Sequence, residues 1–292
     1  MSERAMKAVG AMLAAVAVFS LMDAGLKQLS AHYPSMQVAA LRGAASLPLV
    51  LVWALLTTGW RSLLRVRWRL HVLRGVLGVT MIAAFVHGVR TLPLSTAYSI
   101  FFVAPLLITA LSVPFLGERV GPRRWIAIAT GLIGMLIVLR PTGEGMMTTA
   151  GLAVLYSAFG YAIAAITVRV LSFTDSTQAM VVWLMASMAL GAGALAAPGW
   201  VALRGEHTWL IAGVGLAGAL GQYAVTEAFR LGEASLLAPL EYSALLWGVL
   251  LDLTFWGVLP DVITWLGAAI IVASGLYLLR RERVHVVEVG HP

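Results

Sequence analysis

The chain has 292 residues, of which 60% are hydrophobic and 11% are charged, and its formal net charge is +7. Soluble domains are typically about 45–50% apolar and about 25% charged, so a soluble globular fold is excluded. The basic residues stand in short segments beside apolar stretches and form no basic tail, which argues against nucleic acid as a partner.

The apolar stretches predict an all-α polytopic membrane protein with ten transmembrane helices, because each span needs about 20 apolar residues. In chain order, the first five are expected at 6–29, 36–56, 70–89, 95–116 and 125–139. The second five are expected at 149–171, 178–197, 208–229, 235–256 and 262–279. A cleaved signal peptide is the alternative for the first stretch, but its removal would leave one half a helix short.

Basic residues predict the orientation of these spans. With the N-terminus inside, fifteen of the 20 Arg and Lys residues fall on the inner side, four fall on the outer side and Arg42 lies within a span. Cytoplasmic loops of membrane proteins carry such an excess, so both termini are expected in the cytoplasm. Residues 281–292 are then a cytoplasmic tail.

An internal repeat divides the single membrane domain of residues 1–292 into halves at 6–140 and 149–280. An offset of 140 aligns Arg90 with Arg230 and Gly117 with Gly257. Matching arginines at span ends are not explained by apolar bias alone. Because each half has five spans, the second half enters the membrane upside down, which is the inverted-repeat architecture of secondary transporters.

The first half closes with a signature of Ala97 to Pro105, then Phe115-Leu116-Gly117-Glu118-Arg119, then Trp125 and a helix with Gly131 and Gly134. With the ten spans, this signature resembles the drug/metabolite transporter superfamily, EamA type, over nearly the whole chain. The nearest likeness within it is the bacterial amino-acid and metabolite exporters, including YddG-like aromatic amino-acid exporters. The second half departs from the pattern, because Gly257-Val258 replaces the Gly-Glu pair.

Polar residues inside the spans are candidates for a substrate cavity, because a charge or an unpaired hydroxyl group is costly in hydrocarbon. Two of them, Arg42 and Glu241, have no oppositely charged neighbour three or four residues away. Aromatic faces can also hold an ammonium group. Seven residues are expected to line the cavity: Arg42, Tyr98, Phe102, Tyr161, Tyr223, Glu241 and Tyr242. Static packing between helices is the alternative for each.

A second set lies toward the span ends and is expected to form gates or to carry a proton: Asp23, Lys27, His87, Glu227 and Arg230. Asp23 and Lys27 are four residues apart, and Glu227 and Arg230 are three apart. Residues at these spacings are neighbours on one helix face, so static ion pairs are the alternative.

Two mid-span prolines, Pro105 and Pro239, are expected hinges, because proline removes a backbone hydrogen bond from a helix. No catalytic residue, metal site or cofactor is expected. The sequence has no cysteine and none of the phosphate-loop, Gly-x-Ser-x-Gly or His-Glu-x-x-His motifs, so the protein is not expected to be an enzyme.

The sequence therefore predicts a secondary transporter that exports small metabolites, amino acids in particular, across the bacterial inner membrane. It is expected to work by alternating access through a central cavity. A drug or nucleotide-sugar carrier is the alternative within transport, and a channel is the alternative of another class. The expected partners are a small-molecule substrate and the lipid bilayer, with monomer and homodimer both left open.

Overall fold

A computed structural model describes residues 3–118, 121–139 and 148–257, with fragments at 262–263, 265–267, 269–270 and 273–274. Every regular element assigned within these ranges is helical. Only fragments of the tenth predicted span, at 262–279, belong to the described residues, and the predicted tail at 281–292 falls wholly outside them.

Among the described residues, eight helical segments are long and apolar enough to cross a membrane. They are Glu3–Ser30, Ser35–Thr57, Trp68–Thr91, Leu94–Leu116, Thr149–Leu171, Thr177–Gly199, Gly205–Leu231 and Ala234–Trp256. Each coincides with a predicted span to within a few residues. The fifth predicted span corresponds to the helix α7, Pro122–Leu139.

The helices of the first half are α1 (Glu3–Ser30), α2 (Ser35–Thr57), α3 (Trp60–Leu64), α4 (Trp68–Thr91), α5 (Leu94–Phe101), α6 (Val103–Leu116) and α7 (Pro122–Leu139). Those of the second half are α8 (Thr149–Leu171), α9 (Thr177–Ser187), η1 (Met188–Ala192), α10 (Gly193–Ala196), η2 (Ala197–Gly199), η3 (Gly205–His207), α11 (Thr208–Leu231), α12 (Ala234–Leu237), η4 (Ala238–Ser243) and α13 (Ala244–Trp256).

The fourth and ninth spans are interrupted, and a proline stands at each interruption. In the fourth, α5 ends at Phe101 and α6 begins at Val103, two residues before Pro105. In the ninth, the 3₁₀ segment η4 contains Pro239 and separates α12 from α13. Proline lacks the N–H that would bond four residues back, so each span breaks near this position.

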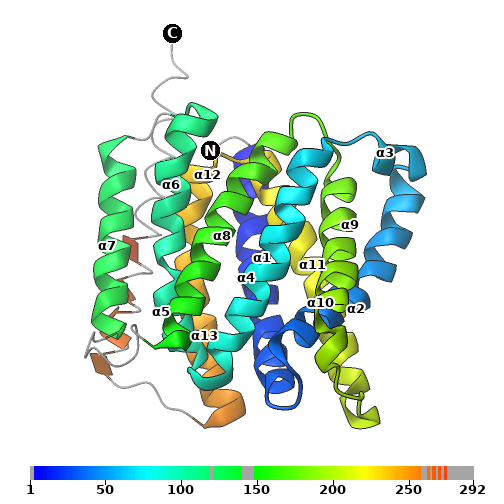
Figure 1. Cartoon of the computed structure of the whole chain (residues 1–292). Helices are drawn as coiled ribbons and strands as arrows, with labels where there is room; N and C mark the ends of the chain where they lie inside the picture. Colours follow the sequence, from blue (N-terminus) through cyan, green and yellow to red (C-terminus); the bar gives the residue numbers. More distant parts are fainter. Residues whose placement is uncertain are drawn as a thin grey trace.

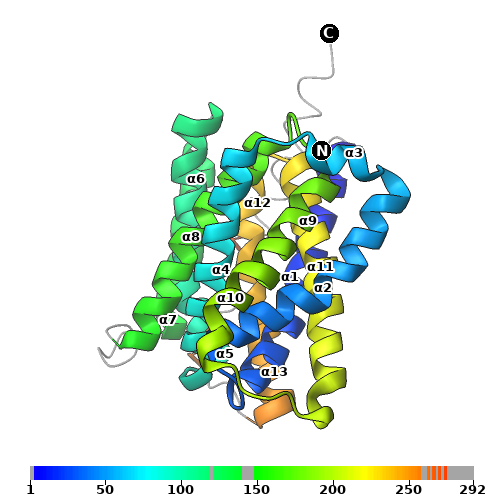
Figure 2. The ribbon, with the colours of Figure 1, turned by 45° about the vertical axis from the view of Figure 1, so that its right-hand side comes forward.

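Helices of the two halves pack against each other. The element α1 lies in the middle of the bundle against α11, and α4 lies against α8, whereas α7 stands at the margin (Figures 1 and 2). The bundle is therefore held together mainly between halves. One buried apolar cluster includes residues of α1, α8 and α11, and another includes residues of α2, α4 and α9.

Two glycines end the corresponding helices α6 and α13 in the same way. Gly117 and Gly257 both adopt φ 66°, in the left-handed region that favours glycine. The Gly117 N–H donates to the Val113 oxygen, and the Gly257 N–H donates to the Leu253 oxygen, both at 3.1 Å. The repeat offset read from the sequence thus recurs in the backbone.

A carboxylate from the opposite half caps the first helix of each interrupted span. Glu118 accepts hydrogen bonds from the backbone N–H groups of Ala234 (2.8 Å) and Ser235 (3.0 Å) at the start of α12. At the start of α5, the Ser95 N–H donates to Asp252 at 3.1 Å. Such bonds satisfy helix N–H groups that have no partner within the helix. The second half therefore has a counterpart of Glu118, but from within α13.

Candidate functional site

A cavity of about 150 Å³ lies among α1, α2, α4, α5, α8, α11 and η4. Five of the seven residues predicted to line a cavity do so: Arg42, Tyr98, Phe102, Tyr161 and Glu241. Asp23, which was predicted as a gate or proton residue, also lines it. Both halves contribute to the walls.

Arg42 projects from α2 into the cavity and is only 2% exposed. Its Nε donates to the Met22 sulfur at 3.1 Å, and its Nη1 donates to the Met188 sulfur at 3.3 Å. The guanidinium also lies 5.8 Å from the centre of the Phe19 ring. Thioether sulfur is a weak acceptor, so this buried cation is solvated far less well than it would be by a carboxylate.

Asp23 and Tyr98 form one acid–tyrosine pair. The Tyr98 hydroxyl group donates to Asp23 Oδ2 at 2.9 Å, which joins α5 to α1. Lys27 does not pair with Asp23. Its Nζ instead donates to the Leu92 oxygen at 2.7 Å and lies 5.0 Å from the Trp256 ring centre.

Glu241 and Tyr161 form a second acid–tyrosine pair. The Tyr161 hydroxyl group donates to Glu241 Oε1 at 2.9 Å, which joins α8 to η4. Glu241 is 6% exposed, and its Oε2 has no hydrogen-bond partner among the described residues. A buried acceptor without a donor is costly, so this oxygen is poised to accept a bond from a ligand.

Aromatic rings form much of the rest of the wall. Phe85 stacks on Tyr98 with ring centres 6.3 Å apart, and Phe101 lies 6.0 Å from Phe85 and 5.3 Å from Tyr161. Phe19 and Phe102 line the same cavity. Such a wall provides flat faces on which a planar ligand can stack.

The residues predicted to line the cavity did not include Arg74, Phe85, Phe101 or Gln222, all of which line it. Arg74 was counted as a cytoplasmic orientation signal. In the structure it is 2% exposed, its Nη1 donates to the Met180 oxygen at 3.0 Å, and its Nε has no partner among the described residues. Arg74 lies inside the third predicted span, at 70–89, and this position could have identified it as a buried charge.

Six of the twelve predicted cavity and gate residues lie outside the cavity wall, and two of these six, Tyr223 and Tyr242, were predicted to line it. Tyr223 is 42% exposed on the outer face of the bundle, with its ring edge-on to Trp53 at 5.0 Å. His87 is also exposed. Tyr242 is 1% exposed and packs edge-on against Phe102 at 5.1 Å, and its hydroxyl group has no partner among the described residues.

Glu227 and Arg230 form the ion pair that their spacing allowed. Both the Nε and Nη2 of Arg230 donate to Glu227, and the Thr177 hydroxyl group donates to Glu227 Oε2 at 2.9 Å. This pair ties α11 to the start of α9 and does not line the cavity.

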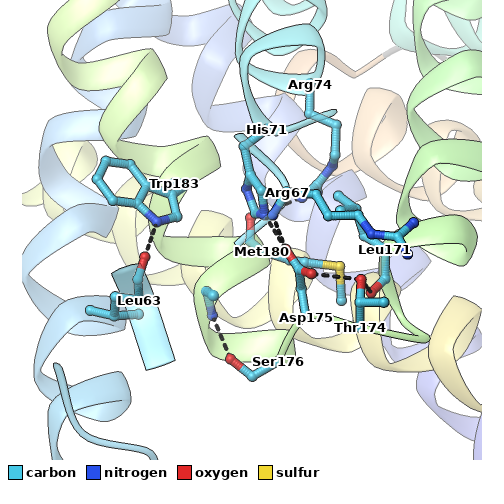
Figure 3. A network of polar contacts seen from close by, with 11 residues as sticks. Leu63, Arg67, His71, Arg74, Leu171, Thr174, Asp175, Ser176, Met180 and Trp183 are labelled. Atoms are coloured by element: carbon cyan, nitrogen blue, oxygen red, sulfur yellow. Dashed lines mark hydrogen bonds and ion pairs between the residues drawn. The ribbon is translucent and has the colours of Figure 1, made fainter. Parts of the chain in front are cut away.

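A polar network closes the end of the molecule where α4 begins and α8 ends (Figure 3). Asp175 Oδ2 accepts bonds from His71 Nε2 at 2.8 Å and from the Arg67 N–H at 3.1 Å, and its Oδ1 accepts one from Thr174 at 2.7 Å. Burial raises the pKa of Asp175, but these hydrogen bonds outweigh it and hold the pKa below its ordinary value of 3.8.

Within the described ranges, no group of three or more His, Asp or Glu side chains is arranged to hold a metal ion. The cavity thus offers arginine, carboxyl, phenol and amide groups among aromatic rings. Groups of these kinds can hold a small molecule through stacking and hydrogen bonds.

Comparison with known proteins adds four findings. The model of the EamA-like transporter family matches residues 6–140. A riboflavin transporter of Vibrio cholerae is 32% identical over 278 residues, covering 93% of this chain and 92% of that protein. The pseudopaline exporter CntI of Pseudomonas aeruginosa is 27% identical over 279 residues, covering 94% and 97%. A solved crystal structure shares the fold with a TM-score of 0.77 at 20% identity, covering 94% and 98%.

Proposed function

The chain belongs to the EamA-like transporter family of the drug/metabolite transporter superfamily, and from this premise we propose that it carries a planar aromatic metabolite of the riboflavin class. It is a multi-pass protein of the inner membrane and a transporter of small molecules, not an enzyme. The proposal concerns the substrate, the transport cycle and the residues that contact the substrate.

The aromatic wall of the cavity is the observation that carries this proposal. The rings follow one another along the cavity in the order Tyr98, Phe85, Phe101 and Tyr161, with successive ring centres 5.3–6.3 Å apart. An isoalloxazine ring has two broad faces and an edge that alternates carbonyl acceptors with an N–H donor. Stacking suits the faces. The edge is complementary to the donors of Arg42 and the free oxygen of Glu241.

The proposed architecture is ten spans in two inverted repeats, at 6–140 and 149–280, with both chain ends in the cytoplasm. Support comes from the reciprocal packing of α1 on α11 and of α4 on α8, and from the two interrupted spans. The matched glycine ends at Gly117 and Gly257 add to it. In this architecture the cavity lies at the repeat interface, where alternating access exposes it to each side in turn. Pro105 and Pro239 are the proposed hinges.

Export of amino acids is the second candidate, and the charges in the cavity favour it. Arg42 and Arg74 can receive a carboxylate, while Asp23 and Glu241 can receive an ammonium group. The two candidate substrates would contact different parts of the cavity, since an amino acid with a small side chain would leave the aromatic wall without a ligand.

Counterflow in proteoliposomes tests both candidates. Vesicles loaded with unlabelled riboflavin are expected to accumulate labelled riboflavin transiently and saturably, which a channel does not do. Parallel vesicles receive labelled amino acids. Exchange of amino acids without exchange of riboflavin would favour the second candidate. Failure of both would leave a drug or nucleotide-sugar substrate to be screened.

A further inference from the structure

The two acid–tyrosine pairs are counterparts in which the partners have exchanged roles. In one pair, the acid Asp23 comes from the continuous helix α1 and the tyrosine Tyr98 from the interrupted fourth span. In the other, the tyrosine Tyr161 comes from the continuous helix α8 and the acid Glu241 from the interrupted ninth span. Both hydrogen bonds measure 2.9 Å. Each pair therefore fastens an interrupted span to a continuous one.

The pairs approach the cavity from opposite ends of the bundle. Tyr98 lies near the start of α5, whereas Glu241 lies in η4, shortly after the start of α12. These two helices begin at opposite ends of the molecule (Figure 1). We call these the α5 end and the α12 end. Under the predicted orientation, the α5 end faces outward and the α12 end faces the cytoplasm.

A continuous line of rings joins the two pairs. Tyr98 is stacked on Phe85 with an interplanar angle of 14°, Phe85 meets Phe101 at 77°, and Phe101 meets Tyr161 at 46°. Phe101 is the last residue of α5, directly before the interruption. Packed rings cannot overlap, so Tyr98 cannot swing away from Asp23 without displacing Phe85, and the displacement passes to Phe101 and Tyr161.

The two pairs are not equally satisfied. The Glu241 Oε2 is buried with no partner among the described residues, whereas the Asp23 side chain is partly accessible and lines the cavity. The acid of the Asp23–Tyr98 pair is therefore better solvated than the acid of the Glu241–Tyr161 pair. A shift of one interrupted span would break one pair and leave the other intact. Two such alternative packings would form the bistable arrangement on which transport cycles depend.

We propose that the two acid–tyrosine pairs and the two phenylalanines between them form one coupled unit that opens the α5 end and the α12 end of the cavity in alternation. When the Asp23–Tyr98 bond breaks, the α5 end opens and the Glu241–Tyr161 bond holds the α12 end closed. The reverse holds in the opposite state. The inference rests on the proposed carrier function, with Phe85 and Phe101 as positioning residues.

Side-specific labelling of a single cysteine tests the coupling without a substrate. The chain has no cysteine, so Ala164→Cys in the cavity wall provides the sole thiol group. An impermeant thiol reagent is applied to right-side-out and to inside-out membranes. Tyr98→Phe is expected to raise labelling from the α5 end about fivefold, the factor that one ordinary hydrogen bond contributes to an equilibrium. It should lower labelling from the α12 end, and Tyr161→Phe should do the opposite.

Phe85→Leu tests the link between the pairs. In the Phe85→Leu background, Tyr98→Phe should still raise labelling from the α5 end but should no longer lower it from the α12 end. Tyr223→Phe is the matched control, because this tyrosine faces away from the cavity and its loss should change neither rate. Asp23→Asn retains an oxygen acceptor for Tyr98 and should preserve most of the closure.

Three results would overturn the inference: unchanged labelling in Tyr98→Phe, a rise from both sides, or full reciprocity in the Phe85→Leu background. Variants are compared only where size-exclusion profiles match that of Ala164→Cys, and Asp23→Ala replaces Tyr98→Phe if the latter does not fold. Because no substrate is present, failure of riboflavin exchange leaves this test intact. Failure of the labelling pattern likewise leaves the substrate proposal standing.

Discussion

Carboxylates at the ends of the bundle and those in the cavity are satisfied to different degrees. At the ends, Asp175 accepts bonds from three donors, Glu118 accepts two backbone bonds, and Glu227 is held by Arg230 and Thr177. In the cavity, Glu241 accepts a bond from Tyr161, and its Oε2 has no partner in the described part of the chain.

The difference separates residues that hold the structure from residues available to a ligand. A fully bonded carboxylate stabilises the fold, because its removal leaves buried donors unpaired. A poorly bonded buried charge lowers stability, and it persists where another molecule completes its bonds. Substitution at the ends should therefore affect unfolding, and substitution in the cavity should affect transport.

Asp175→Ala should show the largest effect, a loss of about 3 kcal/mol in the free energy of unfolding, because a buried partner of His71 disappears. Thermal unfolding in detergent measures it. Glu206→Ala is the control, since its contacts with Arg204 and His207 involve an acid that is 66% exposed. Equal losses in the two variants would contradict the structural role assigned to Asp175.

Arg42→Met should lower transport and leave stability unchanged, which is the opposite of the effect expected for Asp175→Ala. Transport is expected to fall about thirtyfold, because a charge-assisted hydrogen bond to the ligand contributes about 2 kcal/mol. Stability should not fall, since the new side chain joins Met22 and Met188 in an apolar site. Initial rates in proteoliposomes and unfolding curves are compared for the same preparations. A destabilised variant with normal transport would contradict the assignment of Arg42 to ligand binding and of the carboxylates at the ends to stability.

Glu118→Gln should lower stability by about 1 kcal/mol, because an amide can accept only one of the two bonds from Ala234 and Ser235. The expected signature is local, with faster hydrogen exchange at the start of α12. Asp252→Asn provides the matched test at the start of α5, where Asp252 accepts a bond from the Ser95 N–H.

Acidification should give the smallest effect. Because the pKa of folded Asp175 lies below 3.8, this group stabilises the fold above that ordinary value and loses its contribution as pH falls through the lower, folded value. Unfolding temperature should therefore drop more steeply below about pH 4 in the parent than in Asp175→Asn. Parallel pH profiles in the two proteins would exclude this contribution.

The sequence predicts the spans well, because apolar length directly reflects the thickness of the hydrocarbon layer. The span predicted at 149–171 coincides with α8, Thr149–Leu171. The interruptions could also be placed, since Pro105 and Pro239 each remove a backbone donor. These features are local, so residues near one another in the chain decide them.

Partners across the bundle are harder to predict. The spacing of Asp23 and Lys27 suggested a pair on one helix face, yet Asp23 bonds to Tyr98 and Lys27 bonds to the Leu92 oxygen. Spacing constrains neighbours on the same helix, whereas contacts with other helices depend on rotation and depth. The same limit explains why Arg74 was overlooked and why Tyr223 was expected inside.

The π-helical turn η1 holds one more residue per turn than its neighbours and lies against α2 at Gly43, where a Cβ atom would fall 2.5 Å from the Ala189 nitrogen. Removing one residue from this turn would restore an ordinary α-helical register and rotate the preceding helix α9 about its axis by about 100° relative to α10. Met188 would then point elsewhere, and the Nη1 of Arg42 would lose its sulfur contact. A π-helical turn on a neighbouring helix thus decides which atom Arg42 contacts at the wall of the cavity.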